Sequence, residues 1–63
     1  MTASATILSF LRAHPRVEFH WRDVGVRCRL RESVVRQELS RLAREGQIER
    51  PRPGVFVASG GAR

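Results

Sequence analysis

The sequence predicts a mainly α domain with a small β-hairpin, an α+β fold in which three helices come first. Three segments carry apolar residues at helical spacing, and Pro15 and Gly46 end the first and third of them. Two short β-favouring runs then flank a Pro/Gly turn. A chain of 63 residues is expected to form one small domain, with bounds 1–58 and a flexible tail at 59–63.

The first helix is expected over residues 4–14. Four residues recur at three- and four-residue spacing and would share one helix face: Ile7, Phe10, Leu11 and His14. Ser4 or Thr2 is suited to cap its start. Pro15 ends it, because proline disfavours helical backbone in the residue before it.

A very short strand and a short second helix are expected next. Residues 17–20 alternate apolar and polar side chains, which predicts a strand that needs a partner elsewhere. Residues 21–28 place Val24 and Cys28 on one helix face. Gly25 lowers helix propensity by about 1 kcal/mol relative to alanine, so we expect it to permit close approach of a neighbouring helix.

The third helix, expected over residues 31–45, has the clearest pattern. Its buried stripe contains Val35, Leu39, Leu42 and Ala43. Two i,i+4 ion pairs are expected on its surface: Glu32–Arg36 and Arg41–Glu45. Gly46 then supplies the left-handed residue that commonly ends a helix.

A hairpin is expected over residues 47–58, with a stiff turn of prolines and glycine at 51–54. If Phe56 faces the core, alternation directs Val55 and Val57 outward. Such an apolar face is typical of a contact surface, although a bent hairpin would cover it. A homodimer through the first helix or the hairpin is therefore left open.

Charge is the strongest global feature. The net charge is +6, and all twelve basic residues are arginine. Eight of them, against four glutamates, lie in the ordered-looking segment 27–52. GC-rich coding is one interpretation of the arginine usage; recognition of phosphate and guanine is the other. In either case the charge predicts attraction to a polyanion, commonly nucleic acid.

Several function classes are not expected. The chain has one cysteine, so an intrachain disulfide or a cysteine zinc site is not predicted. No run approaches the roughly 20 apolar residues of a membrane span, and no secretory signal is expected. Neither His14 nor His20 has ligand partners at metal spacing. We expect no catalytic residues, no metal, no cofactor, no membrane partner and no small-molecule effector.

In this order of elements the sequence resembles the winged helix-turn-helix superfamily. Residues 24–30, Val-Gly-Val-Arg-Cys-Arg-Leu, look like its second helix and turn. The third helix and its exit into the wing are matched by Val35, Leu39, Leu42, Gly46 and Ile48. Residues 54–56, Gly-Val-Phe, match the return strand. Two residues depart from the pattern: Arg29 replaces a usual turn glycine, and Arg31 replaces a usual Ser or Thr cap.

The resemblance implies double-stranded DNA as partner, with helix 31–45 in the major groove and wing 47–58 on the minor groove or backbone. The residues expected to contact bases are Ser33, Val34, Gln37 and Arg41. Those expected on the backbone or minor groove are Arg27, Arg29, Arg36, Arg44, Arg50 and Arg52. Ser33, near the helix start, is also suited to phosphate.

The expected role is a small prokaryotic or phage transcriptional regulator in the cytoplasm, associated with the nucleoid. Three alternatives remain: a protein-docking winged helix, an architectural or recombination accessory DNA-binding protein, and, less favoured, an RNA-binding protein. Cys28 is expected as a small buried hydrophobe rather than a redox or metal residue. Trp21 is expected to shield the core, with base stacking as the alternative.

Overall fold

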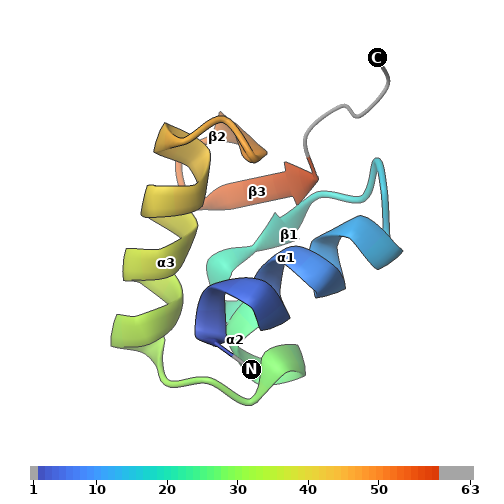
Figure 1. Ribbon diagram of the computed structural model, residues 1–63. Coiled ribbons are helices and arrows are strands. Elements are labelled where there is room, and N and C mark those ends of the chain that lie inside the picture. Colours follow the sequence, from blue (N-terminus) through green and yellow to red (C-terminus); the bar gives the residue numbers. More distant parts are fainter. Residues whose placement is uncertain (1, 59–63) are drawn as a thin grey trace.

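The chain folds in the predicted order, three helices followed by an antiparallel hairpin (Figure 1). The computed structural model describes residues 2–58. Its elements are α1 Ala3–Ala13, β1 Phe19–His20, α2 Trp21–Cys28, α3 Glu32–Arg44, β2 Ile48–Arg52 and β3 Val55–Ala58. The mainly α class with a small β-sheet is confirmed, and the predicted bounds of α1 and α3 differ from the observed ones by one residue at each end. The tail predicted at 59–63 lies outside the described residues.

Thr2, one of the two predicted caps, precedes helix α1, and its hydroxyl accepts a hydrogen bond from the first-turn amide of Ala5 at 3.1 Å. Ile7 and Leu11 are fully buried and anchor the helix in the core. Phe10 is only half-buried, and His14 is exposed. The buried face of α1 is therefore narrower than the sequence predicts, because the helix ends at Ala13 and leaves His14 outside the packed face.

Helices α2 and α3 approach closely at Gly25, as predicted. A Cβ built on this glycine would lie 3.3 Å from Cγ2 of the buried Val35. The turn between the helices places Arg29 in the left-handed region, with φ of 58°. Arg31 precedes α3 without a side-chain hydrogen bond to the helix start. Both departures from the family pattern are thus accommodated, one by a left-handed arginine and the other by an uncapped helix.

The sheet has the strand order β1–β3–β2, so the predicted short strand finds its partner in β3. Phe19 of β1 pairs with Phe56, and Ile48 of β2 pairs with Ala58. The register shifts where Pro51 lies in β2, an edge strand that tolerates a missing amide donor. At the turn, Gly54 has φ of 80°, as a turn with proline followed by glycine requires.

The core lies where the three helices meet one face of the sheet. Its buried residues are Ile7, Leu11, Val24, Val35, Leu39, Leu42, Ile48, Phe56 and Ala58. Phe56 faces inward as expected, whereas Val55 and Val57 are half-buried rather than exposed. Within residues 2–58 the helices are too short or too polar to traverse a bilayer.

Candidate nucleic-acid interface

Helix α3 presents a polar face to solvent. Val35, Leu39 and Leu42 are buried on one side, which turns the opposite side outward. The exposed side chains of the helix include Ser33, Arg36, Gln37, Ser40, Arg41 and Arg44. Val34, which the sequence placed on this outer face, is half-buried at its edge. Two of the four predicted base-contact residues, Ser33 and Gln37, are therefore exposed without a side-chain partner among the described hydrogen bonds.

A groove runs between α3 and the β2–β3 hairpin. It is made of two adjoining clefts of about 700 and 220 Å³ that share Ser40, Arg50 and Phe56. Arg44 lines the larger cleft, and Arg36 lines the smaller one. We call this feature the α3–hairpin groove. It exists because β2 packs beside the C-terminal end of α3 (Figure 1).

The α3–hairpin groove is electropositive. Arg36 and Arg44 enter it from α3, and Arg50 enters it from β2. Within residues 2–58 these three guanidiniums form no ion pair with a carboxylate. One acid, Glu49, lines the larger cleft. The structure therefore places three of the six predicted backbone-contact arginines along one groove, from the consecutive elements α3 and β2.

Trp21, at the start of α2, borders the same groove. Its half-buried ring packs against the core, while the guanidinium carbons of Arg36 and Arg22 lie 5.1 and 5.4 Å from its centroid. Cation–π contacts of this geometry attract a cation without cancelling its charge. The sequence did not single out Arg22, although its position next to the one tryptophan was a usable signal. The predicted Glu32–Arg36 ion pair is absent from the described residues, because Arg36 lies over Trp21 instead.

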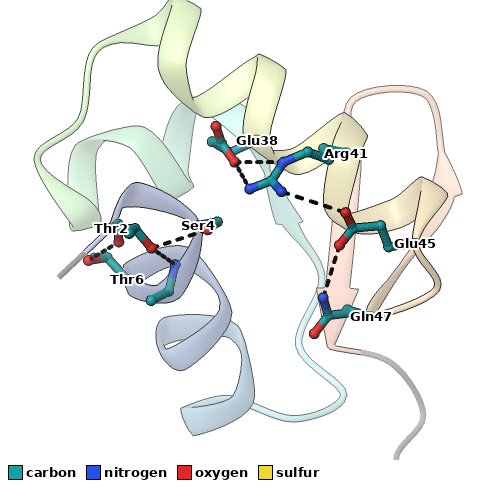
Figure 2. A network of polar contacts seen from close by, with 8 residues as sticks. Thr2, Ser4, Thr6, Glu38, Arg41, Glu45 and Gln47 are labelled. Atoms are coloured by element: carbon teal, nitrogen blue, oxygen red, sulfur yellow. Dashed lines mark hydrogen bonds and ion pairs between the residues drawn. The ribbon is translucent and has the colours of Figure 1, made fainter.

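Arg41 lies on the other flank of α3, between two glutamates (Figure 2). Its Nη2 and Nε donate to Oε1 of Glu38 at 2.5 and 3.1 Å. The predicted pair with Glu45 is confirmed at 3.6 Å. The hydrogen bond to Glu38, with the charges of both glutamates, raises the pKa of Arg41. A base contact by Arg41 remains a prediction, and it would require these carboxylates to be exchanged for the base.

The other predicted backbone contacts lie outside the groove. Arg52 forms an ion pair with Glu18, from the segment before β1. Arg27 lies over the Phe19 ring, 5.8 Å from its centroid. Arg29 is exposed in the turn between α2 and α3. The ten predicted contacts therefore divide into a groove set, an α3 outer-face set and a peripheral set.

Cys28 is half-buried against the core, in line with a small hydrophobe. Burial raises the pKa of its thiol, which keeps it protonated and weakly nucleophilic. In the described part of the chain, no group of three or more His, Cys, Asp or Glu side chains has a metal-binding arrangement.

Comparisons with protein-family models, with curated proteins and with solved structures found no match to this chain. The structural likeness therefore rests on topology alone. Three helices followed by a hairpin, with a short strand before α2 that joins β3, are consistent with winged-helix topology.

Proposed function

We propose that this domain is a winged helix-turn-helix protein that binds double-stranded DNA. Helix α3 would lie in the major groove, and the β2–β3 hairpin would lie against the adjacent minor groove or backbone. An α-helix with its side chains is about 10–12 Å across, which matches the roughly 12 Å width of the major groove. The outer face of α3 is polar and exposed, as such an insertion requires.

The observation that carries this proposal is the arginine-lined α3–hairpin groove. Arg36 and Arg44 of α3 and Arg50 of β2 line this groove, and none of them forms an ion pair with a carboxylate within residues 2–58. One acid, Glu49, lines the larger cleft with them. Three cations against one acid, beside the exposed face of α3, suit a repeating polyanion.

Base recognition is assigned to the outward-facing residues of α3 between Ser33 and Arg41. Gln37 is exposed and has the amide needed for bidentate contact with adenine. Ser33, near the helix start, suits a phosphate or a base edge. Val34 is half-buried, so only the exposed part of its side chain would reach a thymine methyl. Arg41 would read guanine after leaving Glu38 and Glu45.

The biological role proposed is a small transcriptional regulator. A single module of this type buries only about 600–1,000 Å² on DNA, so strong specificity would require a homodimer or adjacent copies. A symmetric dimer would then favour half-sites about 34 Å apart.

A salt titration of binding to a random-sequence duplex tests the proposal. Each phosphate contact contributes about −0.9 to the slope of log K against log salt. Three groove arginines therefore predict a slope of about −2.7 or steeper. Absence of duplex binding at low salt, or affinity that does not change with salt, would contradict the proposal. Salt-insensitive capture of a protein ligand would favour the docking alternative.

A further inference from the structure

Trp21 lies where three elements of the interface meet. It is the first residue of α2, and its backbone N–H donates to the Gly54 carbonyl in the hairpin turn at 2.9 Å. Its ring carries Arg22 from α2 and Arg36 from α3 at 5.4 and 5.1 Å. It also lines the smaller cleft together with Arg50 of β2. One aromatic side chain thus connects α2, α3 and the hairpin.

Two chemically different contacts hold arginine side chains in the described part of this domain. Arg41 and Arg52 are held by carboxylates, which cancel their charge and occupy their donors. Arg22 and Arg36 are held over an aromatic ring, which leaves their charge and their edge N–H donors available. Only the second arrangement both orders a guanidinium and leaves it able to bind an anion.

We propose that Trp21 is a positioning residue that holds Arg22 and Arg36 in place for contact with backbone phosphate. This inference rests on the proposed DNA-binding function and names the residues that make one of its contacts. Arginine side chains lose rotational freedom when they bind phosphate, and a side chain ordered beforehand loses less. Trp21 therefore increases affinity without itself touching the DNA.

The ring's electrons, and not only its volume, are required by this role. Trp21 is half-buried and packs against the core, so its removal also affects packing. Leucine would keep an apolar contact but has no quadrupole to hold a guanidinium. Phenylalanine would keep a weaker version of the same quadrupole. The series Trp, Phe, Leu consequently separates positioning of the arginines from support of the core.

The test is a double-mutant cycle on duplex affinity at fixed low salt. Trp21→Leu is expected to weaken binding about five- to thirtyfold, from the ordering of two side chains, and Trp21→Phe by less. In an Arg22→Ala/Arg36→Ala background, Trp21→Leu is expected to change the dissociation constant less than about twofold. An equal loss in both backgrounds overturns the inference, because the ring would then act independently of the arginines.

If a Trp21 variant fails to fold, an NMR measurement on the unaltered protein still tests the inference. The ring current of Trp21 should move the NMR signals of the Arg22 and Arg36 side-chain methylenes away from those of Arg12 on α1. Signals indistinguishable from Arg12 overturn the inference. Failure of the unaltered protein to bind duplex would remove both this inference and the proposed function, whereas normal binding without coupling removes this inference alone.

Discussion

Replacing Arg50 by alanine is expected to weaken binding to every duplex by a similar factor. Arg50 lines both clefts of the α3–hairpin groove and forms no ion pair within residues 2–58. Its guanidinium is therefore available to phosphate, which carries no sequence information. Loss of a hydrogen bond to a charged group lowers affinity about ten- to hundredfold, so this is the decrease expected for Arg50→Ala.

The matched control is Arg12→Ala. Arg12 is exposed on α1, a helix that contributes no residue to either cleft. Each substitution lowers the formal net charge from +6 to +5, since each removes one of twelve arginines. Long-range attraction is thus reduced by about the same amount in both variants, and a difference between them reports local contact.

Fluorescence anisotropy with two duplexes of unrelated sequence, each measured over a range of salt, provides the assay. Arg50→Ala should reduce the magnitude of the log–log salt slope by about 0.9, whereas Arg12→Ala should leave it nearly unchanged. Equal effects of the two substitutions would refute the reasoning, because binding would then depend on net charge and not on the groove.

Four further outcomes are expected. Arg29→Gly should stabilise the fold by roughly 1 kcal/mol, because glycine adopts the left-handed backbone conformation of this position without strain. The same variant should bind duplex more weakly, and a lower melting temperature would contradict the stability prediction. Glu18→Gln should change stability by less than about 1 kcal/mol, because its pair with Arg52 is exposed, while raising duplex affinity in a binding assay. Arg41→Ala should relax sequence preference in selection from a random duplex pool, and unchanged preference would exclude it as a base reader. Burial raises the pKa of the Cys28 thiol in the folded protein above its value in the unfolded chain. The free energy of unfolding should therefore be highest at neutral pH and decrease at alkaline pH, where the thiol of the unfolded chain ionises first. Denaturant unfolding at a series of pH values, with Cys28→Ala as control, measures this decrease.

The fold was predictable because its signals are local. Pro15 lies just beyond the end of α1, Gly46 follows α3 with φ of 81°, and Gly54 forms the hairpin turn. Each of these residues ends a helix or forms a turn through its own backbone conformation and its neighbours in sequence. The buried stripe of α3 was likewise visible from spacing, since a helix face repeats every three or four residues.

The groove was less predictable because it depends on tertiary packing. Arg36 and Arg50 are separated by most of α3 and a turn, and only the docking of β2 brings them to one cleft. The partner of Arg52 is 34 residues away, at Glu18, and no spacing rule indicates it. By contrast, the pair between Arg41 and Glu45 follows from helical periodicity and was foreseen.

The central claim is that duplex DNA contacts the face formed by α3 and the hairpin. An NMR titration of isotope-labelled protein with a short duplex tests it most directly. The account predicts that shifts concentrate on the indole N–H of Trp21 and on amides of α3 and the hairpin, including Ser40 and Arg50. Shifts centred instead on α1, or none at all, would contradict it.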